Sequence, residues 1–296
     1  MVDESRCAIT LGGSKVRSLE WLLGDALVGG GDVVTLGPAG GQHLLASAVY
    51  GKRVGLRVHA VAWPQPRSEA AERALRVLHA HAEHVWPASS RAVAALVVAR
   101  AVATTRFLAG YAPLVWPPGG SSAVGTLGWV EGGLDLGRAI RDGTLHDIRR
   151  VYVPMGSGGL AAGLSLGLAL SGAVVEVVAI DVAGGGRMVF EGVRWATSRL
   201  LARRGLSVPK PAQVRFVRET SAYGVATAPG AAAAAVAAES GVFVDATYGA
   251  KTLAVALRDA QPERCAFVAT ANARSMGGLL AGALTTVPQR LAGLLQ

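Results

Sequence analysis

The chain has 296 residues, a formal net charge of +9, and a composition that is 51% hydrophobic and only 17% charged. This composition excludes a disordered chain, and the length allows one large domain or two ordinary domains with an apolar core. The arginines lie singly or in pairs, without a basic run interleaved with aromatic residues, so we expect no nucleic-acid partner. The two cysteines, Cys7 and Cys265, do not form a disulfide framework.

Two stretches bear on whether the chain enters or crosses a membrane. Asp3, Glu4 and Arg6 precede any apolar run, so we expect no secretory leader. The apolar stretch 151–182 contains six glycines and ends in β-branched residues, which favours a strand, a turn, a buried helix and a second strand over a spanning helix. We therefore expect a cytoplasmic protein without a membrane partner.

β-branched runs alternate with helix-like stretches along almost the whole chain. The predicted strands are Val33–Leu36, Arg57–Ala62, Leu114–Trp116, Arg150–Pro154, Val174–Ile180, Val214–Val217 and Ala266–Thr270. The predicted helices are Val16–Val28, Leu44–Gly55, Glu69–His81, Arg91–Phe107, Val124–Arg141, Leu160–Ser171, Met188–Arg203, Ala231–Ser240, Lys251–Arg258 and Gly277–Leu284. Apolar strands separated by helices indicate an α/β protein, with parallel strands covered by helices on both faces.

Three of the six histidines lie close together in the sequence. His79, His81 and His84 are predicted to share one helix with Glu83, but their spacing is not that of a zinc-binding helix. We therefore expect them to be surface or core residues, and we expect no metal site.

Lys15 is a candidate catalytic residue because only four of the 29 Lys and Arg residues are lysines. It follows a Gly-Gly turn at the predicted start of a helix. A lysine can lose its proton and form an imine, which an arginine cannot do. On position alone an ordinary solvated lysine is the simpler interpretation, so the role of Lys15 depends on the rest of the chain.

The strongest local signal is the glycine-rich sequence Gly156-Ser157-Gly158-Gly159, which joins a predicted strand to a helix of small residues. Glycines let the backbone approach an anion closely, and a helix N-terminus presents free N–H groups, so a phosphate is the natural ligand. A dinucleotide site is an alternative because Asp181 follows at the end of the next strand. A tight packing turn is the plain structural alternative.

Five segments, taken together and in order, resemble the 1-aminocyclopropane-1-carboxylate deaminase and D-cysteine desulfhydrase family of pyridoxal-phosphate enzymes. They are Gly12–Glu20, which is similar to GGNK-x-R-K-L-E; Gly119–Gly125, similar to GGSNPLG; Gly156–Gly159, similar to the phosphate cup; Tyr223-Gly224; and Asp245–Lys251, similar to D-P-V-Y-x-G-K. The resemblance implies the two-lobed fold of tryptophan synthase β, called fold type II, with parallel sheets flanked by helices.

This resemblance also implies how the chain is divided and what it binds. Residues 1–17 and 128–296 would form the large cofactor-binding domain, and residues 18–127 the small domain. Pyridoxal 5'-phosphate would lie in the cleft between them, with a small amino acid as substrate. Family members usually pair, so a homodimer is possible for this chain too.

The family's division of labour implies roles for individual residues. Lys15 would hold the cofactor aldehyde and then move protons at the substrate α-carbon, while the amides of Gly156–Gly159 would hold the phosphate. Tyr223 and Tyr248 would face the substrate as acid, base or positioning groups, unless they only pack in the core. The Thr270 hydroxyl would meet the pyridine nitrogen, a neutral partner that leaves the ring a weaker electron sink than a carboxylate would.

One departure from the family falls at Gly41-Gln42-His43, where the family has Ser-Asn-His. The family's Ser and Asn handle the substrate carboxylate and the cofactor's ring oxygen. The resemblance therefore implies that Gly41, Gln42 and His43 lie at the substrate, with Gln42 also near the cofactor, but it leaves this chain without the serine hydroxyl.

Other departures affect the remaining motifs. Gly249 stands where the deaminases have Glu, and Ala271-Asn272 replaces Gly-Gly after the threonine. The chain also begins near the family's Arg-Asp-Asp, so we expect roughly the first strands of the large domain to be absent.

These observations predict a pyridoxal-phosphate-dependent lyase or deaminase that acts at the α-carbon of a small amino acid with altered specificity. The alternative is a catalytically impaired homologue that still binds the cofactor. A nucleotide-dependent oxidoreductase is a more distant alternative, because it would leave Lys15 and the segment Asp245–Lys251 unexplained.

Overall fold

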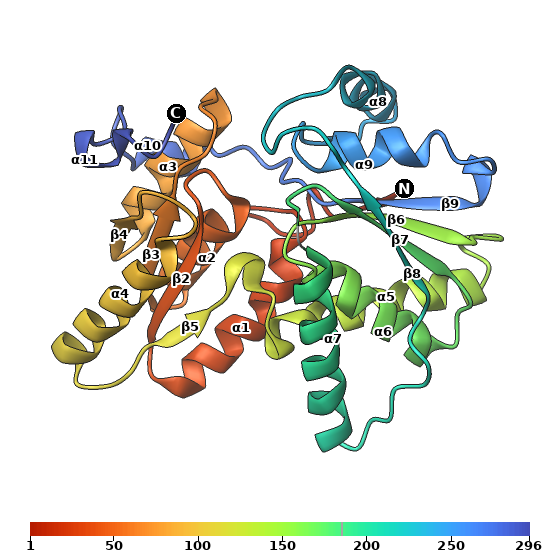
Figure 1. Cartoon of the computed structure of the whole chain (residues 1–296), viewed down its shortest axis with the longest axis horizontal. Coiled ribbons are helices and arrows are strands. Elements are labelled where there is room, and N and C mark those ends of the chain that lie inside the picture. The colour runs from red at the N-terminus through yellow and green to blue at the C-terminus, as the bar shows by residue number, and fades with distance from the viewer. Residues whose placement is uncertain (185) are drawn as a thin grey trace. The chain divides into compact units, whose positions relative to one another are not determined.

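The computed structural model describes residues 1–184 and 186–296 (Figure 1). The chain divides into two compact units. Unit 1 comprises Met1–Ser18 and Ser121–Arg274, and unit 2 comprises Leu19–Gly120 and Ser275–Gln296. Helix α1 (Lys15–Gly29) begins in unit 1 and continues in unit 2, so the chain crosses between the units inside a helix.

Unit 1 contains a five-stranded sheet in the order β1-β9-β6-β7-β8. Its strands are β1 (Val2–Asp3), β6 (Arg150–Met155), β7 (Glu176–Asp181), β8 (Val214–Arg218) and β9 (Cys265–Ala269). Its other elements are α5 (Ala123–Arg141), α6 (Gly159–Ser171), α7 (Gly186–Arg203), α8 (Ala228–Glu239), α9 (Gly249–Ala256) and η2 (Pro262–Arg264). Every neighbouring pair of strands is parallel, so all the carboxyl ends lie at one edge of this sheet.

Helices cover both faces of the unit 1 sheet (Figure 1). On one face, apolar side chains of α5, α6 and α7 pack on the strands, with a core that includes Trp129, Leu164, Phe190, Val153 and Val177. On the other face α8 and α9 do the same, with a core that includes Ala237, Leu253, Tyr152, Val178 and Ile180. Because both faces are buried, β6, β7 and β9 are mostly apolar, whereas the edge strand β8 carries Arg215 and Arg218.

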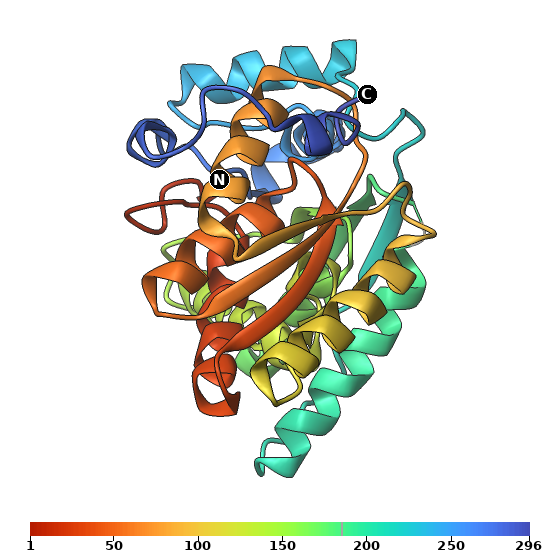
Figure 2. The ribbon, with the colours of Figure 1, turned by 90° about the vertical axis from the view of Figure 1, so that its left-hand side faces the viewer.

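Unit 2 contains a four-stranded parallel sheet in the order β4-β3-β2-β5. Its strands are β2 (Asp32–Pro38), β3 (Arg57–Trp63), β4 (His84–Pro87) and β5 (Leu114–Trp116). Its other elements are α2 (Gln42–Arg53), α3 (Glu69–His81), α4 (Ala94–Ala109), η1 (Pro118–Gly120), α10 (Gly277–Ala281) and α11 (Gln289–Ala292). Helices α2 and α3 pack on one face and α4 on the other, where it crosses the sheet in Figure 2.

The C-terminal segment differs from the predicted division of the chain. We expected residues 128–296 in the large domain, but Ser275–Gln296 groups with unit 2, and the second boundary falls at Ser121. Leu291 and Leu294 are buried in the cluster formed by α2, α3 and the sheet, and Leu295 bridges to Gln65. Burial of these leucines draws the segment to unit 2, which local sequence pattern does not reveal.

All the predicted strands and helices are present within a few residues of their expected ends. The prediction missed β1, β4 and α11, which are short. It was also wrong to place His84 and Glu83 on the helix of His79. Helix α3 ends at His81, because Ala82 turns extended with ψ 145°, and His84 lies on β4.

The described ranges contain neither a metal-binding cluster of side chains nor a helix that could span a membrane. No group of three or more His, Cys, Asp and Glu side chains in residues 1–184 and 186–296 is placed to hold a metal ion. None of the helices in these ranges combines the length and apolarity that a bilayer crossing requires.

Candidate functional site

The carboxyl edge of the unit 1 sheet collects most of the predicted site residues. Strand β6 runs into the loop Gly156–Gly159, β9 runs into Thr270, and β8 leads to the segment that carries Tyr223. Pairing of Tyr152 with Phe267 places the end of β6 beside the end of β9. Ligands of open α/β sheets bind at this edge, so the predicted residues lie where a ligand site is expected.

The loop Gly156–Gly159 has the geometry of an anion cradle. Gly158 caps α6 with φ +87°, and a methyl group added there would lie 2.9 Å from the Phe190 Cα. No side chain at this cap position bonds the first turn of α6. The left-handed glycine lets the chain turn into α6 where a side chain would collide with Phe190, and the loop and first turn then present backbone amides of the kind that bind a phosphate.

Ser121 joins this loop, although the sequence analysis did not assign it a role. Its hydroxyl lies 2.6 Å from the Ser157 hydroxyl and accepts a hydrogen bond of 3.2 Å from the Gly159 amide. The signal was present, since Ser121 belongs to the matched segment Gly119–Gly125. The contact itself depends on the fold, which brings the start of α5 to the loop after β6.

Tyr223 and Tyr248 face each other beside the same loop. The Tyr248 hydroxyl donates to the Tyr223 hydroxyl at 3.4 Å, and the two rings meet edge to face with centroids 5.8 Å apart. A methyl group added at Gly156 would lie 2.9 Å from the Tyr248 hydroxyl oxygen. The structure thus brings both predicted tyrosines to the proposed phosphate loop, with their hydroxyls paired.

The Asp245 carboxylate fixes Tyr248 at the start of α9. Its Oδ1 accepts hydrogen bonds from the amides of Thr247 (2.9 Å) and Tyr248 (2.7 Å), and its Oδ2 accepts one from Gly249 (3.1 Å). An acidic side chain that bonds the first amides of a helix stabilises that end of the helix. Asp245, which the sequence analysis only matched to a motif, is therefore a positioning residue for Tyr248.

The segment before Lys15 is fixed to the end of β9. The Ser14 amide donates to the Thr270 carbonyl at 3.0 Å, and the Trp129 indole donates to the Ser14 carbonyl at 3.1 Å. Gly13 has φ +93°, and a methyl group on it would lie 2.7 Å from the Thr270 carbonyl oxygen. These bonds place Lys15, Thr270 and the end of β6 at one edge of unit 1.

Asn272, one of the departures from the family, has a defined place in this arrangement. Its side-chain Oδ1 accepts a hydrogen bond of 2.7 Å from the Gly12 amide and another of 3.0 Å from the Arg274 amide. The substitution therefore adds a bond that holds the lysine segment, and it leaves the threonine before it in place.

Unit 2 carries the three residues Gly41, Gln42 and His43. Gly41 is the N-cap of α2, Gln42 is its exposed first residue, and His43 is buried with 5% of its surface exposed. The His43 Nε2 lies 2.9 Å from the Thr35 hydroxyl, whose proton goes to the Trp116 carbonyl at 3.2 Å. A hydroxyl has one proton, so Nε2 of His43 is the donor in its bond to Thr35.

These bonds indicate different roles for the three residues. The side chain of His43 bonds Thr35 on β2, so it ties the start of α2 to the sheet of unit 2. The substrate contact that the resemblance implies for His43 stays a prediction. Gly41 has a more direct consequence, because a methyl group added there would lie 2.9 Å from the Pro38 carbonyl oxygen. The loop around Gly41 therefore leaves little room for the side chain of the serine that the family has at this position.

Comparison with known proteins identifies the family of this chain. The family model described as pyridoxal-phosphate dependent enzyme matches residues 4–270. Nocardicin C-9' epimerase of Nocardia uniformis subsp. tsuyamanensis is 34% identical over 81% of this chain and 75% of its own length. D-cysteine desulfhydrase of Salmonella choleraesuis is 31% identical over 83% and 76%, respectively. A putative 1-aminocyclopropane-1-carboxylate deaminase of Pyrococcus abyssi is 33% identical over a match that covers 67% of this chain and 59% of that relative.

A solved structure has the same fold. The crystal structure of an ACC deaminase homologue superposes with a TM-score of 0.72 at 24% identity, covering 92% of this chain and 84% of the other. The chain is therefore an enzyme of the pyridoxal-phosphate-dependent family with fold type II. Within that family it belongs to the group of 1-aminocyclopropane-1-carboxylate deaminases and D-cysteine desulfhydrases, as the sequence analysis predicted.

The family implies pyridoxal phosphate as cofactor, and the residues in this chain fit it. The loop requires glycine at position 158, because an added methyl group would lie 2.9 Å from the Phe190 Cα, and no side chain at this cap position covers the first turn of α6. The oxidoreductase alternative is excluded, because the matched family uses pyridoxal phosphate. Asp181, which kept that alternative open, accepts a hydrogen bond of 2.9 Å from the Gly184 amide and so shapes the loop after β7.

Burial changes the acidity of the Lys15 amine. Lys15 is half-buried, and desolvation lowers its pKa from 10.5 to about 8. Only the neutral amine is a nucleophile, and its fraction rises with pH through the pKa. We therefore expect the rate of cofactor uptake by the apoprotein to rise up to about pH 8 and then level off.

This pH dependence is measured by stopped-flow absorbance in the visible region, with Lys15→Ala as the blank. A rate that still climbs steeply between pH 9 and 10.5 would show that the amine keeps an ordinary lysine pKa.

Proposed function

We propose that this protein removes a proton from the α-carbon of a small amino acid, and that elimination or deamination of the substrate follows. One observation carries the proposal. The carboxyl edge of unit 1 holds an anion cradle, a pair of hydrogen-bonded tyrosine hydroxyls and the segment of a lysine with a lowered pKa. Perturbed titratable groups beside an anion site are typical of catalytic sites.

Each group has a task in this proposal. The amides of Gly156–Gly159 bind the phosphate, and the Lys15 amine holds the cofactor and then accepts and returns the proton at the substrate α-carbon. When bound, pyridoxal phosphate supplies an electron sink for the negative charge that develops at that carbon. The hydroxyls of Tyr223 and Tyr248 donate to or orient the leaving group, and Thr270 offers the pyridine nitrogen a neutral partner.

Substrate handling is expected to differ from that of the family because of Gly41 and Gln42. A hydrogen bond from a hydroxyl to a charged carboxylate contributes about 1.5–3 kcal/mol, which corresponds to roughly 10–100-fold in rate or affinity. We expect weak turnover of D-cysteine and of 1-aminocyclopropane-1-carboxylate. The double variant Gly41→Ser/Gln42→Asn is expected to raise D-cysteine elimination by about 10-fold.

Sulfide release measures this change. The crowding at the Pro38 carbonyl is expected to reduce part of the gain, because the loop must shift by a few tenths of an ångström to admit a serine. Gly24→Ser is the matched control, since Gly24 lies on α1 with no other atom within 4 Å of an added methyl group. If the natural protein already turns over D-cysteine at about 1–1,000 per second, the missing hydroxyl is compensated and the argument fails.

Epimerisation is a second candidate reaction, favoured by a specific observation. The epimerase relative matches 81% of this chain at 34% identity. Epimerisation begins with the same proton removal but returns a proton to the opposite face, which needs a second donor such as the tyrosine pair.

Incubation of the holoenzyme with a panel of D- and L-amino acids in D₂O distinguishes the candidates. Elimination or deamination yields a keto acid and ammonia, whereas epimerisation yields the deuterated mirror image, separated by chiral chromatography. If no amino acid of the panel yields a keto acid or gains deuterium at its α-carbon, the chain is a cofactor-binding homologue without turnover and the proposal is wrong.

A further inference from the structure

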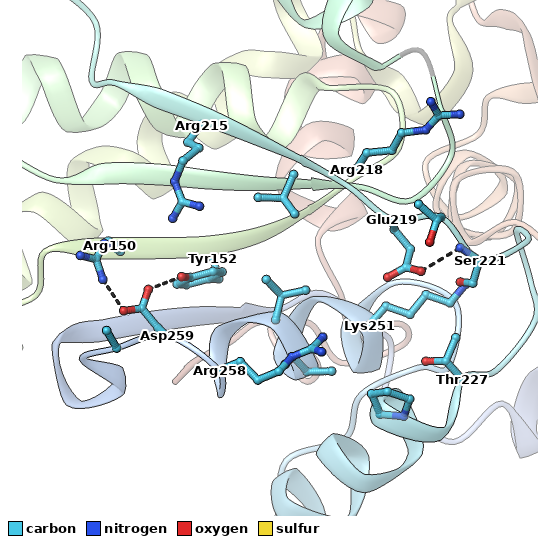
Figure 3. A pocket seen from close by; sticks show the side chains of 16 residues that line it. Arg150, Tyr152, Arg215, Arg218, Glu219, Ser221, Thr227, Lys251, Arg258 and Asp259 are labelled. Carbon is cyan, nitrogen blue, oxygen red and sulfur yellow. Dashed lines mark hydrogen bonds and ion pairs between the residues drawn. The ribbon is translucent and has the colours of Figure 1, made fainter.

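Lys251 is a buried lysine that the functions assigned so far do not use. It is the third residue of α9, and only 1% of its surface is exposed. A lysine is almost never fully buried unless its ammonium group has partners. Its side chain reaches toward Glu219 and Ser221, beside a groove of about 800 Å³ on unit 1 (Figure 3).

The partners of Lys251 lie in the segment that carries Tyr223. The Lys251 Nζ donates to the Ala222 carbonyl at 3.0 Å, one residue before Tyr223. Glu219 begins the same segment, and its carboxylate accepts a hydrogen bond of 2.9 Å from the Ser221 amide. Burial raises the pKa of Glu219, but the hydrogen bonds with Ser221 and the charge of Lys251 outweigh this and lower it overall. An ionised carboxylate and a buried ammonium therefore fix this segment together.

Helix α9 holds the segment at a second point. Tyr248 caps α9, and its hydroxyl bonds the Tyr223 hydroxyl at 3.4 Å. Residues three apart on a helix are neighbours on its surface, so Tyr248 and Lys251 meet the segment side by side. One contact joins the two hydroxyls, and the other fixes the backbone from which Tyr223 projects.

The contacts of Lys251 are with the protein itself, and a ligand in the neighbouring groove is not needed to explain why this lysine is buried. Four arginines line it, but two of them already have acidic partners: Arg150 is paired with Asp259, and Arg215 is paired with Glu176 at 3.1 Å (Figure 3). The Lys251 ammonium donates its hydrogen bond to the Ala222 carbonyl, which also belongs to unit 1. The lysine therefore acts within the protein, on the strand-to-helix segment between β8 and α8.

We infer that Lys251 is a positioning residue: through the Ala222 carbonyl it holds the Tyr223 hydroxyl against that of Tyr248. The inference rests on the proposed function for the importance of the tyrosine pair, but its geometry can be measured without any substrate. Loss of the ammonium group frees the carbonyl of Ala222 and the backbone of Tyr223. The tyrosine pair then loses its fixed geometry, while the phosphate loop and its cofactor affinity are retained.

The test uses the variant Lys251→Met, which keeps a long apolar stem and removes the ammonium group. The chain has five tyrosines, so selective ¹³Cζ labelling gives a simple spectrum. The signals of Tyr223 and Tyr248 are expected to move, while those of Tyr50 and Tyr111 in unit 2 stay fixed. Amide hydrogen exchange across residues 219–224 is expected to rise about 10-fold or more, the size of one lost charge-assisted hydrogen bond.

The matched control is Lys52→Met. Lys52 also donates to a backbone carbonyl at 3.0 Å, that of Ala80, but it is exposed and lies in unit 2. It is expected to leave both tyrosine signals and the exchange of residues 219–224 unchanged. If Lys251→Met leaves them unchanged too, the lysine only fills space and the inference is wrong.

A measurement on the natural chain covers the case in which Lys251→Met does not fold. With four lysines labelled at ¹⁵Nζ, the Lys251 ammonium is expected to exchange its protons slowly, unlike those of Lys52 and Lys210. Equally fast exchange at all four lysines would contradict the bond to Ala222 and overturn the inference. Absence of turnover in the natural protein would refute the proposed function but not this positioning role.

Discussion

Replacing Lys15 with alanine is expected to lower turnover by about 10²–10⁴-fold, because the variant loses the amine that we propose accepts and returns the α-proton. The same change is expected to remove the visible absorption of the cofactor-loaded protein. The surrounding fold should persist, since the Lys15 segment is held by backbone bonds to Thr270 and by the Trp129 indole.

The control for this prediction is Lys210→Ala, at an exposed lysine in unit 1. It is expected to keep both the visible absorption and full turnover. Turnover in Lys15→Ala within about threefold of the natural protein would mean that another group moves the proton. In that event the pH dependence expected for a pKa of about 8 would also need another origin.

Gly158→Ala is expected to weaken pyridoxal phosphate binding by about 10-fold or more. The alanine methyl would lie 2.9 Å from the Phe190 Cα, and the left-handed conformation at φ +87° costs a non-glycine residue about 1–2 kcal/mol. Relief of the clash and the strain is expected to move the first-turn amides of α6 away from the position that fits a phosphate. Fluorescence titration of the apoprotein with the cofactor measures the change.

Helix α6 offers a matched control at its other end. Gly172 caps α6 with φ +76°, but no other atom lies within 4 Å of an added methyl group. Gly172→Ala therefore carries the same conformational strain without the clash and far from the loop. We expect it to lose about 1–2 kcal/mol of stability while keeping its cofactor affinity. Equal losses of affinity in the two variants would show that Gly158 acts only through helix stability.

Much of the fold could be predicted from the sequence because its strands are buried on both faces. Strands such as β6 and β7 are continuous apolar runs bounded by glycine or polar turns, and the helices between them are long. The two-residue β1 and the short β4 carry no such pattern. They form because a neighbouring strand is already in place, as when Val2 pairs with Val268.

The glycine loop could be predicted because its chemistry and its geometry lie in one segment, whereas contacts between distant segments could not. The role proposed for Lys15 rests on the combined resemblance of five segments, because its own position also fits an ordinary solvated lysine. The roles of Ser121 and Lys251 depend on partners distant in sequence, which no local pattern reveals: Ser121 meets the Gly159 amide, and Lys251 meets the Ala222 carbonyl. The hydrogen bond of the buried His43 belongs to the same class, because its partner Thr35 lies on β2, outside the helix that carries His43.

Borohydride reduction of the cofactor-loaded protein, followed by peptide mapping, tests the central claim most directly. The pyridoxyl group is expected on Lys15 and on none of the other three lysines, because Lys15 lies beside the end of β9 at the carboxyl edge of unit 1. A label on Lys52, Lys210 or Lys251, or no label in protein saturated with pyridoxal phosphate, would contradict the assignment of Lys15 as the residue that holds the cofactor.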